Sequence, residues 1–187
     1  MQTLTDLWTL LNRLNRFSFK VNADNDSITG WQGEGQGIIN RRARPHDMKT
    51  DEPGSGAIIE TIERGDYYVT ADRKVSMHNQ YLWQFEGDYI RLTHLRFGWD
   101  KPVFLFDIIE NGQGELVTRQ SHQCAADNYD ASFVLHADRL VMQWRIQGPK
   151  KREVLDYIYS VHTQATSCSP PAGQNERRHL RRYEVLI

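Results

Sequence analysis

The sequence predicts an all-β fold: an antiparallel β-barrel of eight to ten strands with an α-helix at its N-terminus. Short segments in which apolar and polar residues alternate follow one another through most of the chain, and a period of two is typical of strands with one buried face. No segment with helical periodicity separates these strands, which argues against parallel βαβ units. The strands need closure or a second layer to bury their apolar faces, so a two-sheet sandwich is the alternative.

The chain of 187 residues fits one domain, and its formal net charge is −1. We expect a barrel domain over residues 1–162 and a polar tail over 163–187, with room for a final short strand at 183–187. The balanced charge argues against nucleic-acid or polybasic membrane partners. No apolar run reaches the roughly 18 residues of a membrane span. Cys124 and Cys168 give no sign of a disulfide, and we expect a cytoplasmic protein.

The first segment, residues 3–15, has the periodicity of an amphipathic helix. Thr3 and Asp6 are spaced as a capping box at its start. Apolar side chains then recur every three or four positions, at Leu4, Leu7, Trp8, Leu11 and Leu14. Such an apolar stripe must dock on another apolar surface, because a helix of about four turns is marginal in water by itself.

Strand signals begin after this helix. Phe17, Phe19 and Val21 alternate with polar residues, and a second strand follows from residue 28. Gly33, Gly35 and Gly37 share one face of that strand. Glycine weakens a strand, so a repeated glycine face needs a cause: a close approach by the helix or a ligand, or a sharp bend at a barrel corner.

A loop over residues 44–55 leads into the remaining strands. We expect these strands at residues 57–63, 67–71, 74–79, 81–86, 89–96, 103–109, 115–124, 129–136, 139–147 and 154–161. Turn-forming pairs typical of hairpins separate several of them, namely Gly87-Asp88, Asn111-Gly112, Ala137-Asp138 and Gly148-Pro149.

The densest cluster of reactive side chains is His122, Cys124, Asp127 and Tyr129. An imidazole and a thiolate two positions apart on a strand point to the same face, where Asp127 is a third candidate ligand for a soft divalent metal. The same pair is a candidate nucleophile and base. A polar network inside the barrel, with Cys124 packed as a small apolar residue, is the favoured reading, and we expect no metal.

A second polar pair, His94 and Arg96, lies within one strand. An arginine and a histidine that face the barrel interior are suited to a carboxylate or phosphate group. A buried cation needs a partner, for which Asp107, Asp127 or a bound anion are candidates. The alternative is a pair on an edge strand that faces solvent.

The chain resembles a domain-of-unknown-function family with the patterns H-x-C-x-x-D-x-Y and W-x-[VI]-x-G-P-x-K. The first pattern is the His122–Tyr129 cluster, and the second consists here of Trp144, Ile146, Gly148, Pro149 and Lys151. The segment at His94 to Arg96 and the opening helix are also similar, so the resemblance spans about residues 4 to 160. It implies a calycin-like, lipocalin-type barrel and no particular activity.

A looser similarity joins Trp31, Gly33, Gly35 and Gly37 to the first strand of nitrobindin-like haem-binding barrels. The iron-ligating histidine of that family lies near the C-terminal end, in a motif that this chain lacks, and His162 does not match it. We therefore expect no haem and no other cofactor.

These observations favour a binding protein whose barrel interior holds a partly apolar or anionic small molecule. The expected ligand-binding residues are His94, Arg96, His122, Cys124, Asp127, Tyr129 and Trp144. One alternative is an enzyme that uses His122 with Cys124 or Asp127. The other is an interaction module without a pocket, in which Trp31, Trp83, Phe133 and Trp144 close the interior.

Overall fold

The structure is a computed structural model that describes residues 2–24, 26–28, 32–44, 56–70 and 73–162. Several sequence-based expectations lie outside these residues: Trp31, most of the loop over 44–55, Cys168, and the tail with its final strand. The remaining expectations can be compared with the structure directly.

The described residues form one short helix and eleven strands. The helix is α1 (Leu4–Leu11). The strands are β1 (Arg16–Ala23), β2 (Gly33–Arg44), β3 (Ala57–Thr70), β4 (Arg73–Phe85), β5 (Ile90–His94), β6 (Val103–Glu110), β7 (Leu116–Thr118), β8 (His122–Cys124), β9 (Asp127–Leu135), β10 (Arg139–Gln147) and β11 (Arg152–Ser160).

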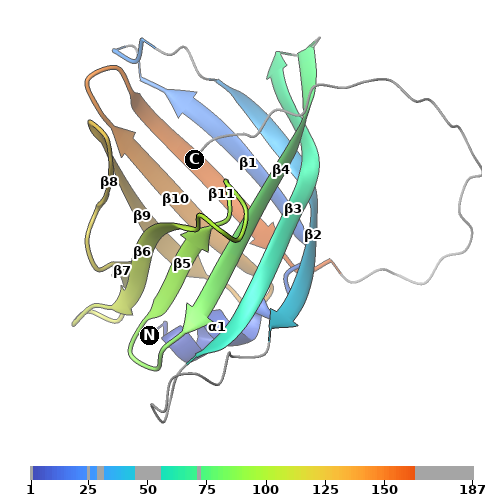
Figure 1. Cartoon of the computed structure of the whole chain (residues 1–187), viewed down its shortest axis with the longest axis vertical. Helices are drawn as coiled ribbons and strands as arrows, with labels where there is room; N and C mark the ends of the chain where they lie inside the picture. The colour runs from blue at the N-terminus through green and yellow to red at the C-terminus, as the bar shows by residue number, and fades with distance from the viewer. Residues whose placement is uncertain (1, 25, 29–31, 45–55, 71–72, 163–187) are drawn as a thin grey trace, which may run out of the picture.

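The strands close into an antiparallel barrel, as the periodicity predicts. Each strand pairs with the next along the chain from β1 to β7, β11 pairs with β1, and β9 joins β7 to β10. Ten described strands therefore form the ring, and β8 is added outside it as a partner of β9 alone. Figure 1 shows the steeply tilted strands and the ring that they make. The sandwich alternative is wrong.

Helix α1 lies across the lower end of the barrel in Figure 1, where it packs against β6 and β10. The Thr3 hydroxyl accepts a hydrogen bond from the Asp6 amide, and the Asp6 side chain accepts one from the Thr3 amide, so the predicted capping box forms. The helix ends at Leu11 rather than at residue 15. The Asn12 side chain donates to the Trp8 carbonyl and satisfies the final turn, and Leu14 is buried from the segment that follows.

Apolar side chains fill much of the barrel, and β2 shows why glycines line one of its faces. Phe19 on β1 and Tyr67 on β3 both pair with Gly35, which lies between them. Their rings stack at 5.7 Å between centroids, and a Cβ at Gly35 would overlap the Phe19 ring. The close approach predicted from the sequence is therefore made by aromatic side chains of the neighbouring strands.

Several strand boundaries differ from those expected. The segments expected at 57–63 and 67–71 form the single strand β3, Ala57–Thr70, because the facing Gly37 and Gly65 let β2 and β3 approach without a break. The segments expected at 74–79 and 81–86 form the single strand β4, Arg73–Phe85. The strand expected at 115–124 is instead two three-residue strands, β7 and β8. Consequently β7 joins β6 through only three residue pairs and β9 through two.

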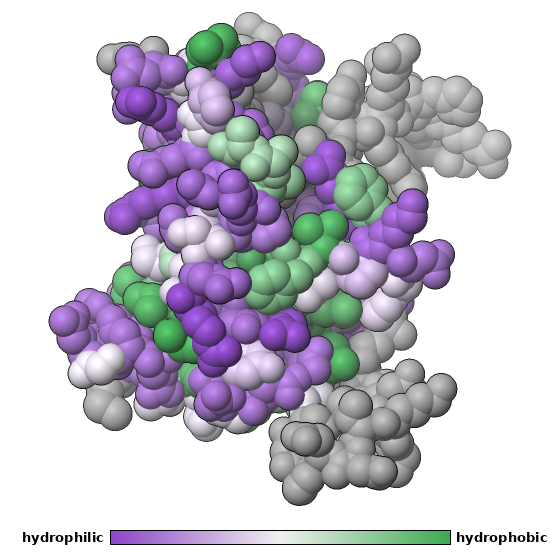
Figure 2. Space-filling model, turned by 60° about the vertical axis from the view of Figure 1, so that its left-hand side comes forward, coloured by the Kyte–Doolittle hydropathy of each residue, from purple (hydrophilic) through white to green (hydrophobic). Residues whose placement is uncertain are grey.

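The outer surface is mixed in character. On the face in Figure 2, polar and apolar side chains are interspersed. Large exposed apolar side chains occur on several strands and loops: Ile28, Ile38, Phe97, Trp99, Phe104, Val134 and Ile158. The described part of the chain contains no helix of the length and apolarity needed to cross a membrane.

Candidate functional site

The two sequence patterns meet at one end of the barrel through an ion pair. The Lys151 ammonium lies 2.9 Å from the Asp127 carboxylate and 3.3 Å from the Tyr129 hydroxyl. Burial lowers the pKa of Lys151, but the hydrogen bonds to Asp127 and Tyr129 outweigh it and raise the pKa overall. This group of three, which we call the hairpin lock, ties the start of β9 to the turn between β10 and β11.

Two neighbouring residues pack against the hairpin lock. The His122 ring lies against Tyr129 with 5.9 Å between the centroids, and partial burial lowers the pKa of His122. Gly148 faces Asp127 so closely that a Cβ there would overlap the carboxylate. The spacing of both patterns is thus consistent with a packed connection between two hairpins.

Cys124 does not share this environment. Its side chain is exposed and its thiol is free, so the expectation that Cys124 packs as a small apolar residue is wrong. The Asp127 carboxylate is engaged by Lys151. Among the described residues, no three His, Cys, Asp or Glu side chains are grouped as a metal site requires.

His94 ends β5 and lies inside the barrel, 4 % exposed. Its ring stacks on Tyr81 with 4.7 Å between centroids. Burial lowers the pKa of His94 to about 4, with smaller contributions from the charges of Arg96 and His78. The imidazole is therefore neutral at pH 7 and acts there as a hydrogen-bonding group rather than a cation.

Arg96, two residues later, is half-buried beside Phe97, with its guanidinium carbon 5.0 Å from the ring centroid. Asp107, a partner considered for it, instead pairs with Arg91 at 2.9 Å and Arg119 at 3.6 Å. His94 contacts Tyr81 on β4, and Arg96 contacts Phe97 in the following loop; neither contact involves a residue of the hairpin lock.

A further polar group lies within the barrel wall. Glu63 on β3 is 1 % exposed and accepts hydrogen bonds from the Asn79 side chain on β4, at 3.1 Å, and from Tyr159 on β11. Burial raises the pKa of Glu63 to about 7, although both hydrogen bonds oppose this shift. Burial and the charge of Glu63 raise the pKa values of Tyr81, Tyr157 and Tyr159 well above the usual range.

We call Glu63, Asn79, Tyr81, Tyr157 and Tyr159 the interior polar group. Four of its atoms are buried without a hydrogen-bond partner among the described residues: Glu63 Oε1, Asn79 Oδ1, and the hydroxyl oxygens of Tyr81 and Tyr157. Buried polar atoms in folded proteins are nearly always paired, and an unpaired one costs about 1–3 kcal/mol. This concentration marks the interior polar group as a candidate binding site.

Trp144, the last residue expected at the site, is fully buried on β10. Its ring lies 5.0 Å from that of Phe106, and its indole N–H is also without a partner among the described residues. Trp83 and Phe133 are buried in the same core. Three of the four aromatic residues expected in a filled barrel therefore do occupy the interior.

Comparison with known proteins places these residues within a family. Residues 22–161 match the model of a family of unknown function, DUF6314. The chain belongs to this family. The match includes the hairpin lock, His94 and the interior polar group, while α1 lies before it. No curated protein matches the chain.

A solved structure has the same fold as this DUF6314 member. It is the S-type phycobiliprotein lyase CPES from Guillardia theta, with a TM-score of 0.54 and 9% sequence identity, and the similarity covers 86% of this chain and 93% of the lyase. At this identity the similarity establishes the fold alone, which is the calycin-like barrel that the resemblance implies.

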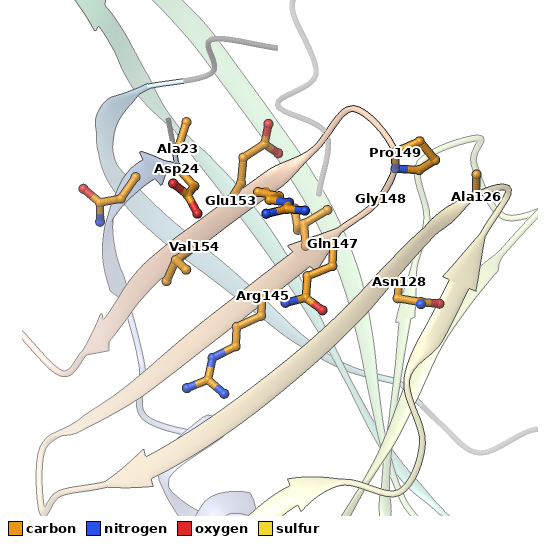
Figure 3. Close-up of a pocket in the computed structure, with 13 residues that line it drawn as sticks. Ala23, Asp24, Ala126, Asn128, Arg145, Gln147, Gly148, Pro149, Glu153 and Val154 are labelled. Carbon is orange, nitrogen blue, oxygen red and sulfur yellow. The ribbon is translucent and has the colours of Figure 1, made fainter. Parts of the chain in front are cut away.

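A groove on the DUF6314 barrel is a second place where a ligand fits. It has a volume of about 830 Å³ and lies beside the turn between β10 and β11, where Gly148, Pro149 and Arg145 are among its lining residues (Figure 3). Both arginines that line it already have partners: Arg145 donates to Gln143 at 3.0 Å, and Arg152 pairs with Asp26 at 2.9 Å.

Sequence reasoning missed the interior polar group. The available signal was parity, because Glu63 alternates in register with the buried Ile59 and Tyr67. That signal is weak here, since Glu60 and Ile62 on the opposite parity are also buried. Tyr157 and Tyr159 alternate on β11 in the same way, but tyrosines on an apolar face do not by themselves indicate a site.

Proposed function

We propose that this protein binds a small molecule inside its barrel, at the interior polar group. The observation that carries the proposal is the set of four buried polar atoms, on three strands, that have no hydrogen-bond partner within the described part of the chain. A ligand that hydrogen-bonds these atoms replaces an energetic cost with favourable contacts, so it stabilises the folded chain. The surrounding aromatic rings add apolar area for the rest of the ligand.

The other expected site residues take different roles in this proposal. His94 stays in the site because it stacks on Tyr81, and Trp144 contributes its free indole N–H. Asp127 and Tyr129 act in the hairpin lock, His122 packs against its Tyr129 ring, and the exposed Cys124 has no part. Arg96 lies against the Phe97 ring and is given no part in binding.

The fold similarity gives limited support. The similar solved structure carries the name of a phycobiliprotein lyase, so the same architecture occurs in a protein named for phycobiliproteins. A shared fold does not transfer the activity. Support for a small-molecule ligand here therefore comes from the unpaired polar atoms of this chain.

The test combines native mass spectrometry with two kinds of tyrosine variant. We expect the full chain to retain a small molecule or to gain thermal stability with members of a metabolite panel. Tyr81→Phe and Tyr157→Phe each remove an unpartnered hydroxyl, so they should stabilise the free protein by about 1 kcal/mol and weaken ligand binding. Tyr129→Phe removes a hydroxyl bonded to Lys151, so it should lower stability and leave binding unchanged.

A filled barrel that serves only as an interaction module is the second candidate, favoured by the buried Trp83, Phe133 and Trp144. It predicts that no small molecule co-purifies, that no metabolite raises the melting temperature, and that Tyr81→Phe is merely stabilising. That set of results would replace the binding proposal. An enzyme at His122 and Cys124 is less favoured because Asp127 is paired with Lys151 and Cys124 is exposed.

A further inference from the structure

We infer that the ligand of the interior polar group carries a primary ammonium, held by Glu63 and Asn79 against the aromatic wall of the barrel. This inference rests on the proposed function and adds the chemical class of the ligand. It differs from the anionic ligand that His94 and Arg96 indicate in the sequence.

The first argument is the chemistry of the unpaired atoms. Asn79 donates its amide N–H to Glu63, which leaves Asn79 Oδ1 free, and Glu63 Oε1 is free as well. A carboxylate oxygen and an amide oxygen only accept hydrogen bonds. The Tyr81 and Tyr157 hydroxyls, which have no partner among the described residues, can accept as well as donate. Glu63 Oε1 and Asn79 Oδ1 therefore need a partner that donates several hydrogen bonds, and a primary ammonium has three N–H donors.

The second argument is charge. Asp107, another buried carboxylate, is paired with two arginines, Arg91 and Arg119. Glu63 has no Lys, Arg or charged His beside it within the described part of the chain, although it is buried more completely. A buried carboxylate is stable in its ionised form only with a compensating positive charge. A ligand cation supplies that charge.

The third argument is the wall around Glu63. Tyr157 stacks on Phe19 at 4.7 Å and on Tyr159 at 5.5 Å between ring centroids, and Tyr81 stacks on His94. Aromatic faces attract ammonium groups, most strongly where water is excluded. His94 is neutral at pH 7, so it does not repel a cation.

The protonation of Glu63 gives the inference a pH signature. The groups that face Glu63 are Asn79 and Tyr81 from β4 and Tyr157 and Tyr159 from β11, with His94 from β5 beyond Tyr81. The tyrosines and His94 keep their charge state between pH 6 and 8. With a Glu63 pKa of about 7, the ionised fraction rises about tenfold over this range, and affinity for an ammonium should rise with it.

The experiment measures binding of four probes to the full chain by calorimetry and thermal shift at pH 6 and pH 8. The probes are 2-phenylethylammonium, its trimethylated quaternary analogue, neutral 2-phenylethanol and anionic phenylacetate. We expect 2-phenylethylammonium to bind most tightly and about tenfold more tightly at pH 8 than at pH 6. Glu63→Gln should weaken it at least tenfold and remove the pH dependence, whereas Glu34→Gln on the exposed face of β2 should change neither.

The outcomes separate the two proposals. Tighter binding of 2-phenylethanol or phenylacetate, with sensitivity to Tyr81→Phe, overturns the ammonium inference and leaves the proposed function standing. Equal binding of the primary and quaternary cations overturns the role of the N–H donors. If none of the four probes binds and no small molecule co-purifies, both proposals fail. Glu63→Gln keeps the shape of the side chain, and its melting curve verifies that it folds.

Discussion

Glu63 and His94 are both buried in the barrel, and burial shifts their pKa values in opposite directions. The pKa of Glu63 is raised from 4.5 to about 7, so its contribution to folding stability is complete below pH 4.5 and is lost as the pH rises towards 7. The pKa of His94 is lowered from 6.5 to about 4, so its contribution is complete above pH 6.5 and is lost as the pH falls towards 4. In the intact protein the two trends oppose each other.

Single substitutions should separate these trends. In Glu63→Gln only His94 remains, and the free energy of unfolding should rise between pH 4 and pH 6.5. In His94→Gln only Glu63 remains, and the free energy of unfolding should fall between pH 4.5 and pH 7, by on the order of 3 kcal/mol. Urea titrations at a series of pH values measure both. Parallel curves for the two variants would show that neither group is shifted by burial.

Gly35 is the residue where backbone and ring packing meet most closely. Because a Cβ there would overlap the Phe19 ring, Gly35→Ala should displace that ring from Tyr67 and lower the free energy of unfolding by about 1–3 kcal/mol. Gly112→Ala is the matched control, since nothing lies within 4 Å of its added Cβ. Thermal unfolding compares them, and equal melting temperatures would contradict the packing role assigned to the glycine face.

Between elements, the hairpin lock holds the start of β9 to the turn that precedes β11. Lys151→Met keeps the aliphatic stem but removes the ammonium that contacts Asp127 and Tyr129. Because the pair is partly exposed, we expect a loss of only about 0.5–1 kcal/mol in global stability. The clearer effect should be faster hydrogen exchange in β8 and the first residues of β9.

Lys150→Met is the control for the hairpin lock, because Lys150 is adjacent to Lys151 in the chain and its side chain is exposed. Hydrogen exchange followed by mass spectrometry should leave β8 unchanged in this variant. If both lysine variants accelerate exchange equally, the effect comes from lost surface charge and not from the contact with Asp127.

Helix α1 closes one end of the barrel through side chains that are almost fully buried. Leu7 is 0 % exposed, so Leu7→Ala should leave a cavity and cost about 2–5 kcal/mol. Thr9→Ala, on the exposed side of the same helix, should cost less than about 1 kcal/mol. Denaturant unfolding measures both. A small loss for Leu7→Ala would mean that the helix is not part of the cooperative core.

For the whole molecule, alternation predicts the strands of the barrel, because a strand with one face in the core alternates buried and exposed side chains. Leu140, Met142, Trp144 and Ile146 on β10 show this clearly. Turn chemistry places the four hairpins correctly. The extent of β3 was not predictable, because the pairing of Gly37 with Gly65 depends on the partner strand. The hairpin lock was predictable from the sequence in part, since its residues belong to the patterns H-x-C-x-x-D-x-Y and W-x-[VI]-x-G-P-x-K.

The interior polar group was not accessible from the sequence for a different reason. Its members are far apart in the chain, from Glu63 to Tyr159, and only ring closure brings β3 and β11 to the same interior. Local alternation cannot indicate which inward side chains face one another across a closed sheet. Local alternation also does not show that Asp107 pairs with arginines, whereas Glu63 has no arginine partner among the described residues.

Because β7 is short, the barrel wall should open locally at this strand before it opens elsewhere. Only two residue pairs join β7 to β9, whereas β3 and β4 run together along thirteen. Local opening of the barrel wall should concentrate at the short pairing between β7 and β9, so small solutes would pass there without unfolding of the remaining strands. Extending this pairing should slow both the entry and the escape of a bound molecule and leave its equilibrium affinity nearly unchanged.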